Sequence, residues 1–513
     1  MRLISIVILT LILGAACSSD GSGESILEAL GLSENVNVEA PADELSGDDP
    51  VDSIAAQLES TGFNGVLLVE QQGELRTLGF GTIDGDASPS VDHDTVFDIG
   101  SITKQFTGAA IVRLEMDGAL SVDDPVGRHL PEVSGPLADV TLHQLLTHTG
   151  GLPDGIGDDE EQIGRADFIA RAVQHVESPG EHRYSNVGYS LLGMVVETAS
   201  GRSYEQYLRD AFFDPLGMTA TGYVLPDWNR HQVAVGYAGT QRVAAPHELN
   251  WGDDGPGWNL RANGGLLSSS TDMRRWVQGL AGDAVLSADA KEKLFGRHEL
   301  ESDGGDTYYG YGWVSFPYGD DQWFRGHNGG NGIFFADLLW FPDDDAMIFV
   351  ATNTSGADED VAFRLAGLLL DTDVGADCRP FVDLASLPST ATFPATPAGA
   401  TGAAMVEVLL TDDEAARRAF VDRHVSESLA QDLSPDEQVA ALAQLHTEFV
   451  GYTVHMIHEQ DSSIFHVVLR QDLAEVVLTV ETDPDAPDES VLPTVMLIDP
   501  ASPDVADPVD TST

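Results

Sequence analysis

The chain reads Asp98-Ile99-Gly100-Ser101-Ile102-Thr103-Lys104 at the start of a largely apolar stretch. If residues 101 to 104 open a helix, the spacing places the side chains of Ser101 and Lys104 on one face. An ammonium group can lose its proton when it is desolvated, whereas a guanidinium group cannot. A lysine at this position can therefore act as the base of the serine hydroxyl and make it a nucleophile.

Lysine is rare in this chain, which makes the lysine after Ser101 informative. Lys104, Lys291 and Lys293 are its only lysines, and arginine supplies nearly all of the remaining positive charge. This usage indicates a position where an amine is needed that arginine cannot replace. A short Ser-x-x-Lys motif also arises by chance, so its meaning depends on the motifs downstream.

Two downstream segments complete a recognisable set. The first is Tyr184-Ser185-Asn186, and the second is Gly326-His327-Asn328-Gly329-Gly330 at the start of an expected strand. With Ser-x-x-Lys, they resemble the three signature elements of the serine β-lactamase and penicillin-binding protein superfamily. The branch they resemble most is that of the class C β-lactamases with their related esterases and D-amino-acid peptidases. Supporting segments of the same branch occur in the family's order at Leu145–Leu152, Pro215–Met218 and Asn263–Leu266.

The resemblance implies a role for each matching residue. Ser101 is expected to be the acylated nucleophile, Lys104 its base or the partner of that base, and Tyr184 a second proton shuttle. Asn186 is expected to orient Lys104 and the substrate. The backbone N–H groups of Ser101 and Gly330 would form the oxyanion hole that stabilises a tetrahedral intermediate.

Each element also has an ordinary structural explanation when it is taken singly. Tyr184 could be a core tyrosine with a satisfied hydroxyl, and His327 a structural histidine. Gly329 and Gly330 could belong to a flexible turn. The joint occurrence of the three elements in the family's order favours the functional interpretation.

His327 bears on the choice of substrate, together with Gly329 and Gly330 of the same element. In β-lactamases proper this position usually carries lysine, a permanent cation for the substrate carboxylate, whereas a histidine of ordinary pKa is mostly uncharged at neutral pH. The resemblance therefore favours ester or D-configured peptide and amide substrates. A β-lactamase or D,D-carboxypeptidase remains an alternative, as does a non-catalytic cell-envelope binding protein.

Other hydrolase classes lack their signatures in this sequence. It contains no Gly-x-Ser-x-Gly for an α/β-hydrolase and no His-Glu-x-x-His for a zinc hydrolase. We expect no metal and no cofactor. The expected partner is a small-molecule or peptide substrate, and the oligomeric state is left open.

The charge of the chain excludes one broad class of partner. Its formal net charge is −59 over 513 residues, so nucleic acids and anionic lipid headgroups are repelled. The acidic residues are spread along the chain, which favours solubility in salty surroundings over one acidic patch for a specific partner.

The first residues are typical of an export signal. Met1-Arg2 precedes an apolar run from Leu3 to Leu13, which is too short for a comfortable membrane span, and Gly14-Ala15-Ala16-Cys17 follows. This resembles a bacterial lipoprotein signal with Cys17 as the lipidated residue, although Gly14 stands where a large aliphatic residue is usual. We expect a membrane-anchored lipoprotein of the cell envelope, or a secreted protein, with Cys378 outside any disulfide.

The pattern of apolar residues predicts an α+β fold. Phe63–Glu70 and Leu75–Phe80 read as paired strands, and Trp323–Asn353 as three antiparallel strands. Helices are expected from Ser101 to Gly118 and over Tyr189–Ala199. Strands at both ends with helices between them predict one antiparallel sheet flanked by helices and a helical region, as in β-lactamases and transpeptidases.

A second unit follows a change of composition. The segment Phe381–Gly402 is rich in Pro, Ala, Thr and Gly, and helix and strand patterns resume after it. We therefore predict a small α+β accessory domain. The predicted parts are an export signal (1–16), a disordered tether (17–50), the hydrolase domain (51–375), a linker (376–402), the accessory domain (403–500) and a disordered tail (501–513).

Overall fold

The computed structural model describes most of the chain between residues 49 and 498. The residues left out within this range are 86–87, 230–231, 239–240, 303–304, 320–321, 356, 358, 373, 375–388, 391, 395, 425–434, 449–452, 460–463, 472–473 and 482–493. The predicted signal, residues 17–48 of the predicted tether and the predicted tail, with Cys17 and Cys378, lie outside the described residues. Pro50, the last residue of the predicted disordered tether, already begins a helix that Asp49 caps. No helix within the described ranges is long and apolar enough to cross a membrane.

The chain divides into two compact units. Of the described residues, the larger unit lies within 49–237 and 242–374, and the smaller unit lies mainly within 389–498. Each unit has its own buried apolar core.

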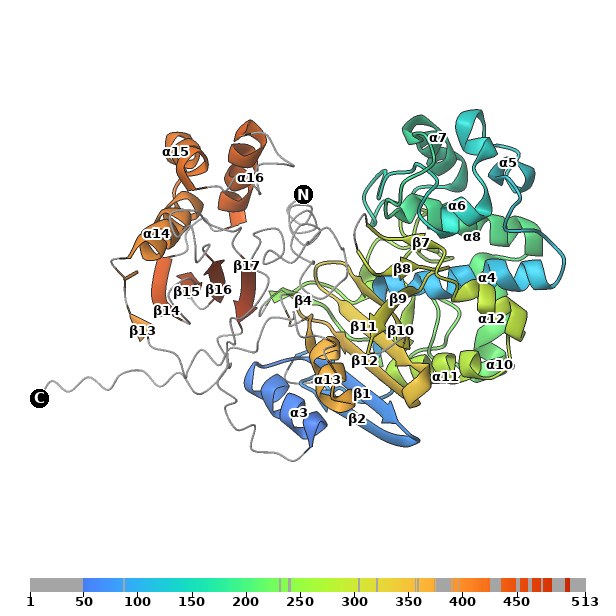
Figure 1. Ribbon diagram of the computed structural model, residues 1–513, viewed down its shortest axis with the longest axis horizontal. Helices are drawn as coiled ribbons and strands as arrows, with labels where there is room; N and C mark the ends of the chain where they lie inside the picture. Colours follow the sequence, from blue (N-terminus) through green and yellow to red (C-terminus); the bar gives the residue numbers. More distant parts are fainter. Residues whose placement is uncertain are drawn as a thin grey trace, which may run out of the picture. The chain divides into compact units, whose positions relative to one another are not determined.

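An eight-stranded antiparallel sheet forms the centre of the larger unit (Figure 1). Its order is β2-β1-β12-β11-β10-β9-β8-β7, so β1 lies beside β12, with Gly65 opposite Thr352. The strands are β1 (Gly65–Gln71), β2 (Glu74–Phe80), β7 (Glu299–Leu300), β8 (Tyr308–Tyr309), β9 (Val314–Tyr318), β10 (Gln322–Gly330), β11 (Phe335–Phe341) and β12 (Ala346–Thr352). This sheet contains all the strands predicted for the hydrolase domain.

Helices pack on both faces of this sheet. On one face, α3 and α13 contact each other, α3 contacts β2, and α13 contacts β11 and β12. On the other face, α11 packs on β1 and β12 (Figure 1). The helices are α3 (Pro50–Ser60), α4 (Thr103–Met116), α5 (Val126–His129), α6 (Leu142–Leu146), α7 (Arg165–His175), α8 (Asn186–Ser200), α9 (Tyr204–Leu208), α10 (Asp214–Leu216), α11 (Ser270–Ala281), α12 (Ala288–Leu294) and α13 (Val361–Leu370). The predicted α+β class is confirmed.

Helix α4 occupies the interior of the larger unit. Every residue from Thr103 to Val112 is buried, and the helix packs against α8 and α12. A helix that is apolar on nearly all sides is one that other elements surround. The helix predicted from Ser101 is thus present, although its first turn, Gly100–Ile102, is a 3₁₀ turn.

The described part of the smaller unit contains three helices and a five-stranded antiparallel sheet of order β13-β14-β15-β16-β17. Its core includes Met405, Leu409, Phe420 and Phe465. Its elements are β13 (Ser389–Thr390), α14 (Pro397–Leu410), α15 (Glu414–His424), α16 (Pro435–Glu448), β14 (Thr453–Glu459), β15 (Ile464–Gln471), β16 (Ala474–Glu481) and β17 (Thr494–Ile498).

Helix α14 corrects one predicted boundary, because it begins inside the segment predicted as a linker (376–402). The side-chain oxygen of Thr396 accepts the N–H of Gly399 at 3.0 Å, and Pro397 occupies the first helical position. A threonine cap followed by proline starts a helix rather than an irregular linker. Ala398 is buried in the core of the smaller unit. The other domain limits stay predictions.

Candidate active site

Ser101 lies in the 3₁₀ turn between strand β3 (Val96–Asp98) and helix α4. The chain enters this turn through Gly100, whose φ of 47° lies in the left-handed region that favours glycine. The Ser101 side chain is half-buried, whereas Lys104, in the first turn of α4, is fully buried. Their Oγ and Nζ atoms are 2.9 Å apart, as the motif predicts.

The Lys104 amine has no carboxylate among its hydrogen-bond partners. Besides Ser101, its Nζ donates to Oδ1 of Asn186 at 2.5 Å and to the carbonyl oxygen of Asn263 at 2.8 Å. Burial lowers the pKa of Lys104 from 10.5 to about 7, and the charges of Asp154 and Asp159 oppose this shift. A large fraction of the amine is therefore neutral near pH 7, as a general base requires.

Asn186 is the first residue of α8, and Asp154 fixes its orientation. The Nδ2 atom of Asn186 donates to Oδ1 of Asp154 at 2.8 Å, which leaves the amide oxygen to face Lys104. The backbone carbonyl of Asp154 accepts the N–H of Asn186 at 3.0 Å and of Val187 at 3.3 Å. These are orphan N–H groups of a helix start, so the loop before α7 caps α8. Asp154 was not predicted from the sequence, and it lies just beyond the family-like segment Leu145–Leu152.

Tyr184 also lies at this site, with its side chain half-buried. The Nζ atom of Lys104 lies 4.7 Å from the centre of its ring, in the geometry of a cation–π contact. The ring of His148 packs against Tyr184, with 4.4 Å between the centres. The phenol is thus held between the predicted base and a buried histidine.

His148 is a second residue that the sequence analysis did not single out. Its φ is 58°, an uncommon value for a residue other than glycine. Its Nδ1 atom accepts the backbone N–H of Ser185 at 3.0 Å, so the ring proton is on Nε2. Burial lowers the pKa of His148 well below 6.5, and the charges of His182, Lys104 and His327 act in the same direction. A neutral histidine therefore fixes the backbone beside Tyr184.

Strand β10 brings the third sequence element to Ser101. It pairs with β9 only over Gln322–Gly326, but with β11 as far as Gly330. The edge of β10 beyond Gly326 is thus not paired with β9, and it lies against the turn that carries Ser101. A Cβ atom on Gly329 would lie 2.3 Å from both the Ile99 carbonyl oxygen and the Ser101 nitrogen. Only glycine allows this close approach of two backbones.

His327 is placed at the site as a buried, neutral residue. Its Nδ1 atom lies 2.6 Å from the carbonyl oxygen of Asn328, which can only accept, so Nδ1 carries the proton. Nε2 then accepts from the hydroxyl of Tyr309 at 3.0 Å. Burial, aided by the charge of Lys104, lowers the pKa of His327 to about 3. Its predicted contact with substrate stays a prediction, and both ring nitrogens already have partners.

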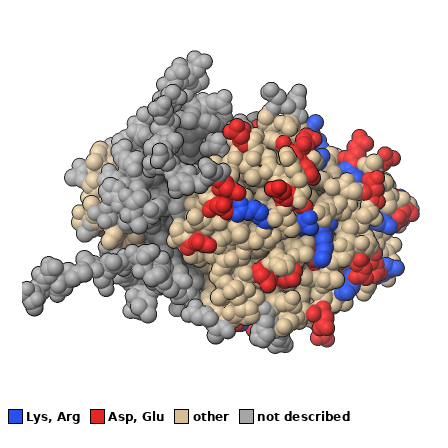
Figure 2. Space-filling view, turned by 90° about the horizontal axis from the view of Figure 1, so that it is seen from below, with Lys and Arg blue, Asp and Glu red and all other residues tan. Residues whose placement is uncertain are grey.

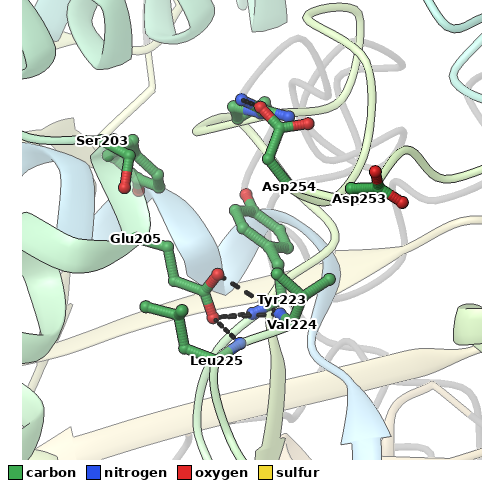
Figure 3. Close-up of a pocket in the computed structure, with 9 residues that line it drawn as sticks. Ser203, Glu205, Tyr223, Val224, Leu225, Asp253 and Asp254 are labelled. Atoms are coloured by element: carbon green, nitrogen blue, oxygen red, sulfur yellow. Dashed lines mark hydrogen bonds and ion pairs between the residues drawn. The ribbon is translucent and has the colours of Figure 1, made fainter.

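Figure 3 shows a small pocket that is lined in part by residues 203–205 and 223–225. Its volume is about 130 Å³, and its lining includes Glu205, Tyr223 and Arg261. The Glu205 carboxylate accepts backbone N–H groups of Tyr223, Val224 and Leu225 at 2.7 to 3.0 Å, drawn as dashed lines in Figure 3. The Tyr223 hydroxyl then donates to the carbonyl of Gly264 at 2.8 Å. The pocket walls thus support the segment that contains Asn263.

No metal site accompanies these residues. Within the described ranges, no three His, Cys, Asp or Glu side chains are grouped so that they could hold a metal ion. The structure brings together all the predicted site residues that it describes: Ser101, Lys104, Tyr184, Asn186, His327, Gly329 and Gly330.

A buried helix that begins with Ser-x-x-Lys beside an antiparallel sheet is the architecture of the serine β-lactamases and penicillin-binding proteins. Residues 51–371 match the model of the Beta-lactamase family, which is more than half of the chain. The chain belongs to this family, whose members include serine hydrolases that act through an acyl-enzyme.

Two curated proteins illustrate the relationship. The chain is 31% identical to penicillin-binding protein 4* of Bacillus subtilis (strain 168) over 277 residues, which cover 49% of this chain and 59% of that protein. It is 29% identical to protein flp of Staphylococcus aureus (strain COL) over 226 residues, or 42% of this chain and 44% of that protein. The chain thus spans about half the length of the curated relatives it matches.

A solved structure extends the likeness of fold. The octameric penicillin-binding protein homologue from Pyrococcus abyssi superposes with a TM-score of 0.56 at 20% identity. This match covers 88% of the present chain and 95% of that chain. At this identity the likeness concerns the fold alone.

Proposed function

We propose that this protein is an exported serine hydrolase that cleaves an ester or an amide through an acyl-enzyme on Ser101. The observation that carries the proposal is the contact of 2.9 Å between Ser101 Oγ and a fully buried lysine amine. A carboxylesterase or a D-amino-acid peptidase fits this site.

The chemistry follows from the positions of the atoms. Neutral Lys104 accepts the hydroxyl proton of Ser101 while Oγ bonds to the carbonyl carbon of the substrate. The substrate oxygen becomes an oxyanion beside the N–H groups of Ser101 and Gly330. When the intermediate collapses, the leaving alcohol or amine takes a proton from Tyr184 or Lys104. Water then attacks the acyl-enzyme, and the acid product and free Ser101 result.

The state of His327 supports a substrate without an essential carboxylate. The buried, neutral ring supplies no cation to such a group, unlike the lysine usual in β-lactamases proper. Esters and D-configured peptides or amides are therefore favoured over β-lactams. A β-lactamase or a D,D-carboxypeptidase is the alternative within the same chemistry.

The expected surroundings of the enzyme rest on its sequence and surface. The residues around Cys17 support export and lipid anchoring in a bacterial cell envelope, with secretion as the alternative. Figure 2 shows acidic side chains scattered over one face of the described residues. With a net charge of −59, this distribution favours a small-molecule or peptide substrate over nucleic acid, and no cofactor is needed.

Covalent labelling of the purified protein tests the proposal. A fluorophosphonate probe and a fluorescent penicillin are applied to the native chain, to Ser101→Ala, and to Ser60→Ala at the exposed end of α3. Labelling that is lost only in Ser101→Ala is expected, with the fluorophosphonate as the preferred probe. Preference for penicillin would favour the β-lactamase or carboxypeptidase alternative. A folded protein that neither probe labels would be a non-catalytic binding protein instead.

A further inference from the structure

One buried carboxylate connects the two segments that carry the proposed oxyanion-hole donors. Asp98, the last residue of β3, is 3% exposed. Its Oδ1 atom accepts the backbone N–H of Gly100 at 2.8 Å, and its Oδ2 atom accepts Nδ2 of Asn331 at 3.2 Å. We call this pair of residues the Asp98–Asn331 bridge.

Each end of the bridge lies next to one of the two proposed oxyanion-hole donors in the sequence. Gly100 precedes Ser101, and Asn331 follows Gly330, so each bond acts next to one of the two proposed N–H donors. The bridging side chains are 233 positions apart in the sequence. A single carboxylate thus joins the start of α4 to the end of β10.

The orientation of the Asn331 amide is fixed by its own loop. Its Oδ1 atom accepts the backbone N–H of Ile333 at 3.1 Å and of Phe334 at 2.8 Å. A rotated amide would turn its NH₂ group toward these donors and lose both bonds. Only Nδ2 is therefore offered to Asp98, and only an acceptor at residue 98 satisfies it.

Backbone packing leaves the same two segments little freedom. A Cβ atom on Gly100 would lie 2.6 Å from the Gly330 nitrogen and from the Gly329 carbonyl carbon. This contact limits how closely the segments approach, and the bridge resists their separation. The packing of Gly100 therefore sets a lower limit on the distance between the two segments, and the bridge sets an upper limit.

We propose that the Asp98–Asn331 bridge positions the N–H groups of Ser101 and Gly330 against each other as an oxyanion hole, with Asp98 as a positioning residue. The inference rests on the proposed function, because it needs Ser101 to be the nucleophile. Donors aimed at an oxyanion act mainly in the transition state. Loss of the bridge is therefore expected to lower kcat and to change KM little.

Exchange of the two side chains tests the bridge directly. In Asp98→Asn the new NH₂ group faces the NH₂ group of Asn331, and in Asn331→Asp two carboxylates face each other. The double variant restores one donor and one acceptor, while the new carboxylate at residue 331 can still accept from Ile333 and Phe334. Hydrolysis of a p-nitrophenyl ester and the melting temperature are measured for all four proteins.

Each single variant is expected to lose at least about tenfold in kcat, the scale expected of a misplaced reacting group. The double variant should recover most of this loss. Asp94→Asn, which removes an exposed charge from the same segment, should keep the native kcat. A purely structural bridge would lower the melting temperature and leave kcat of the folded fraction unchanged, which would overturn the proposal.

Two results separate this inference from the proposed function. If Ser101→Ala keeps the native turnover, the proposed function is wrong and the inference falls with it. If Ser101→Ala abolishes turnover while Asp98→Asn retains kcat, or while the double variant recovers nothing, the inference alone is wrong.

Discussion

The Nζ atom of Lys104 lies 2.8 Å from the backbone carbonyl oxygen of Asn263, which is 159 positions further along the chain. This carbonyl can only accept hydrogen bonds, and the Asn186 amide oxygen, held by Asp154, is also an acceptor. A neutral amine has two N–H donors and one lone pair. In the neutral form these two donors face the two acceptors, which leaves the lone pair for the hydroxyl of Ser101, 2.9 Å away.

Lys104→Arg should remove most of the activity. A guanidinium group stays protonated and cannot accept the Ser101 proton, so we expect turnover to fall by about 10² to 10⁴-fold. The matched control is Lys293→Arg, whose side chain is half exposed and pairs with Glu115 at 2.6 Å. Ester hydrolysis measured at a fixed fraction of folded protein checks this prediction. Equal activity of the two variants would rule out Lys104 as the base.

The rate should rise with pH as Lys104 loses its proton. With a pKa of about 7, the acidic limb of kcat/KM is expected near that pH in the free enzyme. Asp154→Asn removes a negative charge that favours the ammonium form, so the pKa falls and the limb moves to lower pH. The new amide oxygen can still accept from Asn186, which preserves its orientation. A pH–rate profile in which the acidic limb stays at the same pH or moves to higher pH would contradict this account.

Gly329→Ala and Gly330→Ala should differ sharply in how well the fluorophosphonate probe labels them, although the two glycines are neighbours. At Gly329 the added methyl group would meet the backbone of Ile99 and Ser101 at 2.3 Å, so the two segments must separate. At Gly330 the nearest atoms, from Phe334 and Phe335, would lie at 3.4 and 3.5 Å, which is ordinary contact. We expect fluorophosphonate labelling to be lost in the first variant and retained in the second. Retained labelling in both would show that the close approach is unnecessary.

Asp337 should make stability depend on pH. This residue of β11 is 2% exposed, and burial raises its pKa to about 7, with Glu359 and Asp360 adding to the shift. The folded state therefore binds a proton that the unfolded chain has lost above about pH 4. The stability contributed by this proton is present at low pH and is lost as the pH rises to about 7.

The comparison with Asp337→Asn isolates this effect from the many exposed carboxylates. The amide is similar in shape and does not titrate, so the variant should gain melting temperature relative to the native protein between about pH 5 and pH 8. Thermal unfolding of both proteins at the two pH values measures the difference in melting temperature. A difference independent of pH would show that Asp337 is not protonated in the folded state.

Much of the candidate site was predictable because its motifs are local. Ser101 and Lys104 are three residues apart on one helix start, and Tyr184 and Asn186 flank the residue that caps α8. The glycines of β10 were recognisable from the resemblance of the segment Gly326–Gly330 to the third signature element of the family. The fold class was predictable from the apolar patterns, which place strands at both ends of the larger unit and helices between them.

The supporting residues were not predictable, because their partners are distant in the sequence. Asp98 bonds to Asn331, and His148 to the backbone of Ser185, through loops without a periodic pattern. No local feature of the sequence distinguishes Asp154 from other polar loop residues, because its role depends on the position of α8. Composition also misled the analysis at Pro397, where small residues form a packed helix instead of a linker.

The position of β1 between β2 and β12 has a consequence for biosynthesis. A ribosome releases β1 and β2 one after the other, but the second neighbour of β1, Ala346–Thr352, emerges about 270 residues later. Until then β1, which is apolar from Val66 to Val69, has an open edge. The growing chain therefore carries an unpaired edge of β1 throughout this interval, and the sheet of the larger unit is complete only once β12 has been released.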